Sequence, residues 1–191
     1  MHLEIIIGST REARVGVHVG HWFERIARAH GKFDIELIDL AHVKLPLFDE
    51  PKHPRLREYK HDHTKAWSAR IARADAYVFV TPEYNYAPPP SLVNALDYLV
   101  HEWGYKPVAF VSYGGVSGGT RSVQMTKLIV TGLKMMPIVE AVNFPFVANS
   151  FNKETGAFEP AAAQEDAAKV MLNELYRWAE ALKPMRAKPA G

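Results

Sequence analysis

Residues 76–86 read Ala-Tyr-Val-Phe-Val-Thr-Pro-Glu-Tyr-Asn-Tyr. The first five are apolar, β-branched or aromatic, and they predict a β-strand. A polar loop stiffened by proline follows, and the triplet Pro88-Pro89-Pro90 leads from that loop into a helical pattern. The order strand, loop, helix is typical of the units that build parallel α/β sheets.

The same order recurs along the rest of the chain. The periodicity of apolar residues predicts strands at 3–7, 33–40, 76–80, 106–112 and 137–142. It predicts helices at 15–30, 56–74, 91–103, 120–136 and 161–182, with Ser91 as the N-cap of the third. Residues 46–54 carry three prolines and are expected to be irregular, and residues 144–158 are expected to form a hairpin or loop.

Five strands alternating with five helices predict one doubly wound α/β domain over residues 1–183. A chain of 191 residues suits a single domain. Right-handed crossovers restrict the strand order without fixing it. We expect the order 2-1-3-4-5, with helices on both faces, because it brings the loops described below together. The C-terminal tail, residues 184–191, is expected to be disordered.

The composition narrows the class of protein. The 23 basic and 21 acidic side chains are interspersed and give a net charge of +2, so no nucleic-acid partner is expected. The chain has no cysteine, which excludes disulfides and thiolate chemistry. No window approaches the roughly 18 apolar residues of a membrane span. The N-terminus begins directly as a strand with no targeting pattern, and we expect a cytoplasmic protein with no membrane partner.

The first loop, residues 8–16, has the composition of an anion site. Small residues, hydroxyl groups and the guanidinium groups of Arg11 and Arg14 precede a helix. Free N–H groups at a helix start attract phosphate, and arginine adds bidentate hydrogen bonds. The loop lacks the spaced glycines of a dinucleotide fingerprint and the Gly-Lys-Ser/Thr of a P-loop, which favours a monophosphate. The alternative for this loop alone is a polar turn with surface arginines.

The second loop, residues 81–90, is stiff and aromatic. Its prolines fix four φ angles, and Glu83, Tyr84, Asn85 and Tyr86 stand between them. Such a loop can pack against a tricyclic ring while its N–H groups bond the polar edge of that ring. The alternative is a loop whose tyrosines pack on the core.

The third loop, residues 112–119, is rich in glycine, which allows its backbone to approach a ligand closely. Taken alone it is a weak signal, because glycine-rich turns are common. All three loops follow predicted strands, however, and loops at the carboxyl ends of parallel strands converge on one crevice. The ligand should be flat, apolar across its face and anionic at one end, and flavin mononucleotide (FMN) fits this description.

These three segments resemble the flavin-contacting segments of the NAD(P)H-dependent FMN reductase family, which includes quinone, azo-dye and chromate reductases. The resemblance spans roughly residues 3–140 and implies a flavodoxin-like fold, bound FMN, and a homodimer or homotetramer. It implies that the phosphate is held by Ser9, Arg11, Arg14, Val15 and Gly16. It implies that the ring is held by Pro82, Glu83, Tyr84, Asn85, Ser112, Tyr113, Gly114 and Gly115.

Two departures from the family pattern stand out. Relatives often carry Ser or Asn where this chain has Arg14-Val15-Gly16, so Arg14 is expected to replace hydroxyl contacts. Relatives also often carry Lys at the position of Val93, so a charged contact made by that lysine is absent here.

The resemblance implies an oxidoreductase in which hydride passes from NADPH or NADH to the flavin. A small-molecule acceptor such as free flavin, a quinone or an azo compound would then enter the same site, giving ping-pong kinetics. The cofactor supplies the chemistry, so we expect no catalytic residue. Two alternatives stay open: a flavodoxin-type electron carrier without NAD(P)H turnover, and an interaction domain without flavin. The near-neutral charge argues against the carrier.

Histidines and tryptophans outside the loops have simpler interpretations. On a helix, residues two apart point about 200° from each other, so His61 and His63 would not share an ion and no metal site is expected. Trp67, Trp103 and Trp178 lie at apolar helical positions and are expected in the core or at a dimer interface.

Overall fold

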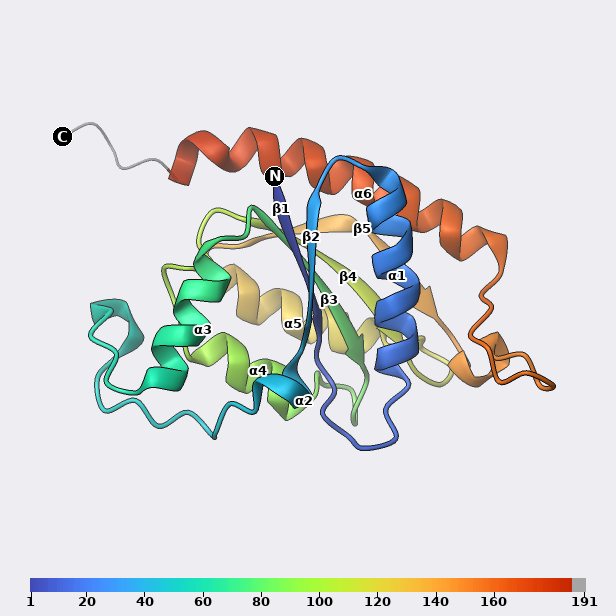
Figure 1. Cartoon of the computed structure of the whole chain (residues 1–191), viewed down its shortest axis with the longest axis horizontal. Helices are drawn as coiled ribbons and strands as arrows, with labels where there is room; N and C mark the ends of the chain where they lie inside the picture. Colours follow the sequence, from blue (N-terminus) through green and yellow to red (C-terminus); the bar gives the residue numbers. More distant parts are fainter. Residues whose placement is uncertain (187–191) are drawn as a thin grey trace.

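The computed structural model describes residues 1–186 and consists of one parallel sheet with helices on both faces (Figure 1). The strands pair in the order β2-β1-β3-β4-β5, as expected. Their bounds are β1 (His2–Ile7), β2 (Asp34–Asp39), β3 (Ala76–Pro82), β4 (Pro107–Tyr113) and β5 (Met136–Phe144). The α-helices are α1 (Gly16–His30), α2 (Leu40–Val43), α3 (Asp62–Ala72), α4 (Pro90–Asp97), α5 (Thr120–Gly132) and α6 (Ala162–Leu182).

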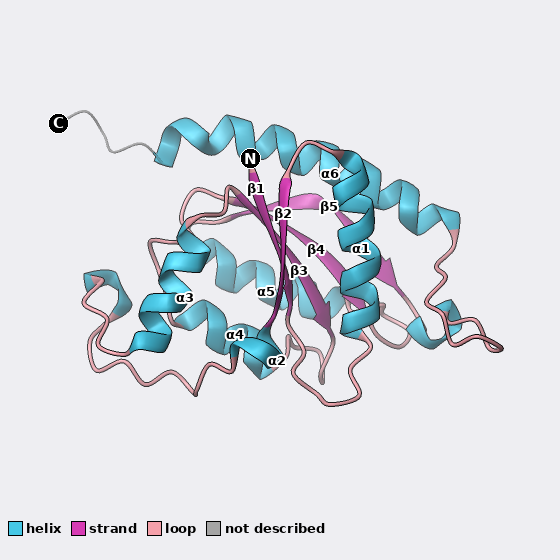
Figure 2. Ribbon diagram, viewed as in Figure 1, coloured by secondary structure: helices cyan, strands magenta, loops and turns pink. Residues whose placement is uncertain are grey.

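The helices form two layers around the sheet, visible in Figure 2. Helices α1 and α6 pack on one face, and α3, α4 and α5 cover the other. Side chains alternate between these faces along each strand. In β3, Val78 and Val80 belong to the first core, whereas Tyr77 and Phe79 belong to the second. All seven residues of β3 are buried, which explains why this strand gives the strongest signal in the sequence.

The strand register sets the position of the loops. Ile7 of β1 pairs with Val80 of β3, and Thr81 of β3 pairs with Ser112 of β4. The carboxyl ends of the three central strands therefore coincide. The loops that follow them leave from one edge of the sheet, which we call the carboxyl edge.

Three helices are shorter than expected, and in each case the chain turns away from the helix. Residues Pro54–Leu56 form a separate 3₁₀ turn that ends at Arg57 with a φ of 54°, so α3 starts only at Asp62. After α4 the chain leaves the helix at Tyr98 and runs through turns, and after α5 it turns at Lys134, which has a φ of 59°. Left-handed backbone cannot continue a right-handed helix.

The tail is ordered further than expected. Residues Lys183–Arg186 form a 3₁₀ turn, and Arg186 donates hydrogen bonds to the carbonyl of Asp75 at 3.0 Å and to its carboxylate at 2.7 Å. The expectation of disorder is therefore wrong for 184–186, because this ion pair holds the turn against the sheet. Residues 187–191 lie outside the described part of the chain.

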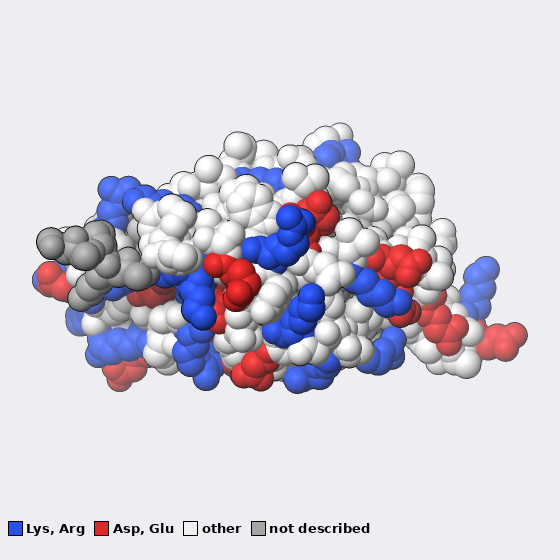
Figure 3. Space-filling model, turned by 90° about the horizontal axis from the view of Figure 1, so that it is seen from above, with Lys and Arg blue, Asp and Glu red and all other residues white. Residues whose placement is uncertain are grey.

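The surface carries charges of both signs (Figure 3), and two of the expected core tryptophans are buried. The face seen in Figure 3 carries interspersed basic and acidic side chains. Trp67 and Trp103 are 2% and 0% exposed and lie in the core, as expected. Trp178 is partly buried against the first core. Within residues 1–186, no helix is both long and apolar enough to cross a membrane.

Candidate functional site

The first loop is fastened to the second at the carboxyl edge of the sheet. The N–H of Gly8 donates to the carbonyl of Val80 at 2.9 Å, which holds the start of the loop beside β3. The buried hydroxyl of Ser9 lies 2.6 Å from the hydroxyl of Tyr84. Two residues predicted to hold opposite ends of one ligand are therefore in direct contact.

Helix α1 presents an uncapped N-terminus to this loop. Its N-cap residue, Val15, makes no side-chain capping bond, and the first turn carries no acidic residue. The N–H groups of a first helical turn have no partner within the helix, so they remain available to an anion. A Cβ at Gly16 would lie 2.5 Å from the hydroxyl oxygen of Tyr113, so a larger residue here would displace that side chain.

The two arginines of the first loop are placed differently. Arg14 forms an ion pair with Asp39 at the end of β2 and donates to the carbonyl of Arg11 at 3.1 Å. Arg11 itself is exposed. Arg14 thus ties the first loop to the end of β2, whereas the exposed guanidinium of Arg11 is free to reach a ligand.

The second loop closes in a tight turn. Tyr84 and Ala87 exchange two backbone hydrogen bonds of 2.9 and 3.0 Å. The two residues between them, Asn85 and Tyr86, have φ angles of 51° and 73°. This is the geometry of a two-residue turn with left-handed central residues. It leaves both side chains exposed at the tip.

Glu83 connects the second loop to the third. Its carboxylate accepts hydrogen bonds from Ser117 Oγ at 2.7 Å, from Arg121 Nε at 2.6 Å and from the Arg121 N–H at 3.2 Å. Burial disfavours the charge of Glu83, but the bonds from Arg121 and Ser117 outweigh it and lower the pKa of this carboxyl. The guanidinium of Arg121 also stacks over the ring of Tyr86, 3.9 Å from its centroid.

Arg121 and Ser117 were not among the expected site residues. Ser117 lies in the third loop, and Arg121 follows that loop by two residues. Their role could not be inferred, because the partner that they share, Glu83, is more than thirty residues away along the chain.

The third loop depends on glycine at particular points. Gly118 and Gly119 have φ angles of 59° and 83°. A Cβ at Gly119 would lie 2.8 Å from the carbonyl oxygen of Tyr113, whereas one at Gly115 would meet nothing within 4 Å. Ser112 Oγ donates to the carbonyl of Gly118 at 2.8 Å and closes the loop. Ser112 therefore fixes the conformation of the loop, and the space beside Gly115 is unoccupied by the other described residues.

Tyr113 ends β4 beneath the first loop. Its hydroxyl is buried without a hydrogen-bond partner among the described residues, and this burial raises its pKa. An orphaned hydroxyl beside the uncapped start of α1 is the polar lining that a phosphate-bearing ligand would use. The donor set at this edge consists of backbone N–H groups, hydroxyls and Arg11, and it fits the phosphate of FMN. The turn of the second loop and the open side of Gly115 fit its flat ring.

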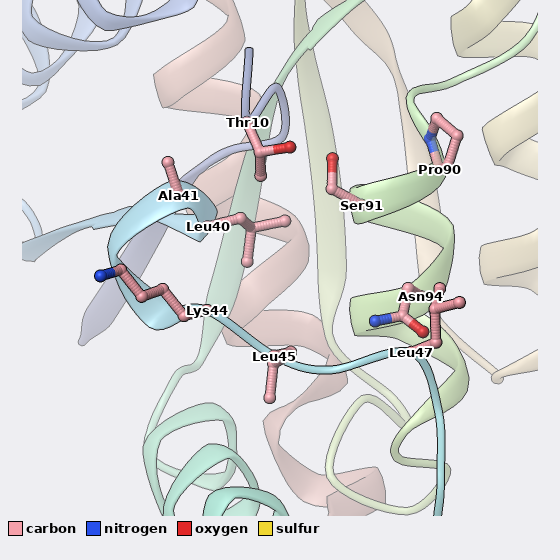
Figure 4. Close-up of a pocket in the computed structure, with 9 residues that line it drawn as sticks. All are labelled: Thr10, Leu40, Ala41, Lys44, Leu45, Leu47, Pro90, Ser91 and Asn94. Carbon is pink, nitrogen blue, oxygen red and sulfur yellow. The ribbon is translucent and has the colours of Figure 1, made fainter. Parts of the chain in front are cut away.

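A cavity of about 400 Å³ lies beside the first loop (Figure 4). Its lining residues come from the first loop, from α2 and the segment after it, and from the start of α4: Thr10, Leu40, Ala41, Lys44, Leu45, Leu47, Pro90, Ser91 and Asn94. Sequence reasoning missed this cavity, because α2 is a single short turn with no periodic signal.

Two expectations, one for Ser91 and one for His61 and His63, need correction. The N-cap of α4 is Pro89, not Ser91, because the hydroxyl of Ser91 instead donates to the carbonyl of Gly8. His61 precedes α3 with extended backbone, so its ring stacks on that of His63 at 5.1 Å and both rings face Asp49. The expected divergence of these histidines is wrong, because it assumed that both lie within a helix.

The strand order and the two layers of helices define a flavodoxin-like fold. A solved NAD(P)H:(acceptor) oxidoreductase from Paracoccus denitrificans, FerB, has the same fold, with a TM-score of 0.72 at 19% identity. The match covers 94% of this chain and 97% of FerB.

Sequence comparison gives the family. The model of the NADPH-dependent FMN reductase family matches residues 1–149, and the chain belongs to that family of flavin-dependent oxidoreductases, which use FMN and NAD(P)H. An NAD(P)H-dependent FMN reductase of Schizosaccharomyces pombe is 41% identical over 145 residues, 74% of this chain and 72% of that protein. A 2-hydroxy-1,4-benzoquinone reductase of a Burkholderia species is 29% identical over 129 residues, covering 65% of this chain and 66% of the relative.

Proposed function

We propose that this protein is an FMN-dependent NAD(P)H oxidoreductase that passes electrons to a small acceptor such as a quinone, free flavin or an azo compound. One observation carries the proposal. Glu83, Ser117 and Arg121 brace the second loop against the third, while Ser9 and Tyr84 join the first loop to the second. Three loops from distant parts of the sequence form one wall, as a single shared ligand requires.

In this proposal each loop contacts a different part of FMN. The first loop holds the phosphate with the start of α1 at Val15 and Gly16, with Ser9 and with Arg11, while Arg14 positions the loop through Asp39. The ring lies against the two other loops, along the segments Pro82–Asn85 and Ser112–Gly115. FMN, when bound, supplies the redox chemistry by accepting a hydride and releasing the electrons to an acceptor. The chain supplies binding and orientation.

The rim of the site favours one shared entrance. Tyr86, Val116 and Phe146 are 64%, 71% and 55% exposed, and the N–H of Phe146 donates to the carbonyl of Gly115 at 2.8 Å. Nicotinamide and acceptor would use this apolar rim in turn, which gives ping-pong kinetics. The name of the Burkholderia relative makes quinones the first acceptors to test.

The same rim supports a homodimer or homotetramer. Three large apolar side chains around one opening form a patch whose outer side a second subunit could contact while the opening stays accessible. Sedimentation equilibrium of wild type and of Val116→Ser tests this step: we expect a dimer or tetramer that the substitution weakens. A wild-type monomer would contradict it. We also propose a cytoplasmic location, which the lack of cysteine permits.

The decisive experiment is a spectrum followed by rapid mixing. We expect the purified protein, after incubation with FMN, to show the absorbance of a bound oxidised flavin. In anaerobic stopped flow, NADPH or NADH should bleach that absorbance, and a quinone should restore it. A flavin that stays oxidised for minutes with both donors would identify an electron carrier instead. A colourless protein that leaves the fluorescence of added FMN unchanged would indicate an interaction domain.

Steady-state kinetics test the order of events. Double-reciprocal plots at several quinone concentrations should give parallel lines, because donor and acceptor alternate at one site. Lines that intersect would show that both bind together and would exclude the shared entrance.

A further inference from the structure

The opposite end of the sheet holds a polar cluster that the flavin site does not use. Glu4 of β1 pairs directly with Glu36 of β2 in the parallel register, and His2 lies two residues before Glu4 on the same face of β1. The Nε2 of His2 is 3.3 Å from Glu36 Oε2 and 3.9 Å from Glu4 Oε1. Within residues 1–186, this is the one place where three ligand atoms from His, Asp or Glu lie within 4.8 Å of one another.

Two of the three groups in this cluster have ligand atoms that lack hydrogen-bond partners, whereas Glu36 Oε2 is already paired with Arg73. Glu4 is fully buried, and neither of its carboxylate oxygens has a hydrogen-bond partner. The Nε2 of His2 is also buried and unpartnered. An unpartnered buried carboxylate is costly, and proteins retain such groups where a bound ion or a specific function compensates for them.

Neighbouring side chains hydrogen-bond to His2 and Glu36, as residues behind the ligands of a metal site commonly do. Asp34 lies 3.3 Å from the Nδ1 of His2, which directs Nε2 toward the two glutamates. Metal-binding histidines commonly have such a carboxylate on their other nitrogen. Both oxygens of Glu36 have an arginine partner: Oε1 accepts from Arg70 Nε at 2.7 Å, and Oε2, the oxygen nearest to His2, accepts from Arg73. An ion bound here would share Oε2 with Arg73.

We propose that His2, Glu4 and Glu36 bind a divalent transition-metal ion of the zinc type at this edge of the sheet. Imidazole and carboxylate are ordinary zinc ligands, with bonds of roughly 2.0–2.2 Å. Bonds of that length place neighbouring ligand atoms of a tetrahedron about 3.3 Å apart, close to the distance between His2 and Glu36. The ion links β1 to its neighbour β2, and it enters past His2, whose side chain is 20% exposed.

The test measures zinc binding by the flavin-loaded protein without an affinity tag. After treatment with EDTA and removal of the chelator, the protein is dialysed to equilibrium against Zn²⁺ at low micromolar concentration, and bound zinc is counted by mass spectrometry. We expect one tightly bound ion per chain. Glu4→Gln should lower the affinity on the order of 100-fold, and Asp34→Asn about tenfold, as outer-shell changes do elsewhere.

His63→Gln is the matched control, because it removes a histidine that also contacts an aspartate but lies outside the cluster. We expect its zinc affinity to equal that of wild type. Thermal unfolding and FMN content, measured for every variant, establish that each is folded. Anomalous diffraction from crystals soaked with Zn²⁺ should show the ion between His2, Glu4 and Glu36. The proposal is overturned by an ion found elsewhere, by no bound zinc in wild type, or by a Glu4→Gln affinity within twofold of wild type.

Discussion

Two buried glutamates at opposite edges of one sheet behave in opposite ways. At the carboxyl edge, three hydrogen bonds from Ser117 and Arg121 hold Glu83 ionised and lower its pKa against the effect of burial. The opposite edge, at which the strands begin, is called the amino edge. There, burial and then the neighbouring charge of Glu36 raise the pKa of Glu4 to about 8, and the carboxylate oxygens of Glu4 have no hydrogen-bond partner.

The difference separates two uses of a buried charge. Glu83 braces two loops and has its donors in place, so its ionised form stabilises the fold. Glu4 has no such donors in the chain, so its buried carboxyl destabilises the fold unless something outside the chain compensates for it. The carboxyl edge is therefore assembled by the chain itself, whereas in our proposal an ion completes the amino edge.

The bracing of the carboxyl edge gives the largest expected effect. Gly119→Ala should lower the free energy of unfolding by about 3 kcal/mol, because a side chain is strained at a φ of 83° and its Cβ would clash with the backbone of Tyr113. FMN affinity should fall with it. Urea denaturation and FMN titration measure both quantities.

Gly115→Ala is the control in the same loop. A Cβ there meets nothing within 4 Å, so the free energy of unfolding should change by less than about 0.5 kcal/mol. Equal losses in the two variants would show that the loop responds to any added side chain and is not fixed at Gly119.

The same substitution at the two glutamates should have opposite effects. In the presence of EDTA, Glu83→Met should lower the free energy of unfolding by about 1.5 kcal/mol, because it strips the donors on Ser117 and Arg121 of their acceptor. Glu4→Met should raise it by about 1 kcal/mol, because a methionine of similar volume replaces a buried carboxyl without partners. Two changes of the same sign would contradict the comparison.

The pH dependence of stability distinguishes the glutamates further. Glu83 has a lowered pKa, so its contribution is present above the unfolded value of about 4.5 and is lost as the pH falls below it. Glu4 has a raised pKa, so its contribution is most favourable below about 4.5 and is lost as the pH rises through about 8. The advantage of Glu4→Met over wild type should therefore grow between these values, as urea denaturation across that range can measure. A constant advantage would contradict the raised pKa.

The carboxyl edge could be predicted from the sequence because its motifs are local. Each loop directly follows an apolar strand. Residues such as Pro82 and Gly119 also indicate the local backbone conformation by their type alone, because proline restricts φ and glycine permits positive φ. The strand order followed from the need to bring those loops together. Helix ends were less predictable, because turns at Arg57 and Lys134 adopt left-handed backbone without glycine. Local propensity gives no warning of such turns.

The amino edge could not be predicted in this way. Glu4 appears in the sequence as a polar residue within an apolar strand, and only the register of β1 on β2 places it beside Glu36. The contact between Glu83 and Arg121 is equally nonlocal. Pairs that depend on register or on distant loops have no signature in a single sequence.

The two arginines of the first loop are expected to affect FMN binding to different extents. Arg11→Ala should weaken FMN binding about tenfold, because a charge-assisted contact with the phosphate is lost. Turnover at saturating FMN should change less. Fluorescence titration with FMN and steady-state kinetics give the two numbers.

Arg14→Ala provides the contrast. Its guanidinium is already paired with Asp39, so the main effect should be on stability and loop order, with a smaller loss of FMN affinity than in Arg11→Ala. If Arg14→Ala released more FMN than Arg11→Ala, the guanidinium of Arg14 would be the one that meets the phosphate.

The contact between the first and second loops has the smallest expected effect. Tyr84→Phe and Ser9→Ala each remove one side of the 2.6 Å contact between their hydroxyls, and each should lower the free energy of unfolding by about 1 kcal/mol. The double variant should cost less than the sum of the two, because the second substitution removes a hydroxyl that has already lost its partner. Strict additivity in urea denaturation would show that the hydroxyls do not couple in solution. The position of the first loop would then depend on the two bonds of Gly8, to the carbonyl of Val80 and from the hydroxyl of Ser91, and the pair of hydroxyls would add no stability of its own.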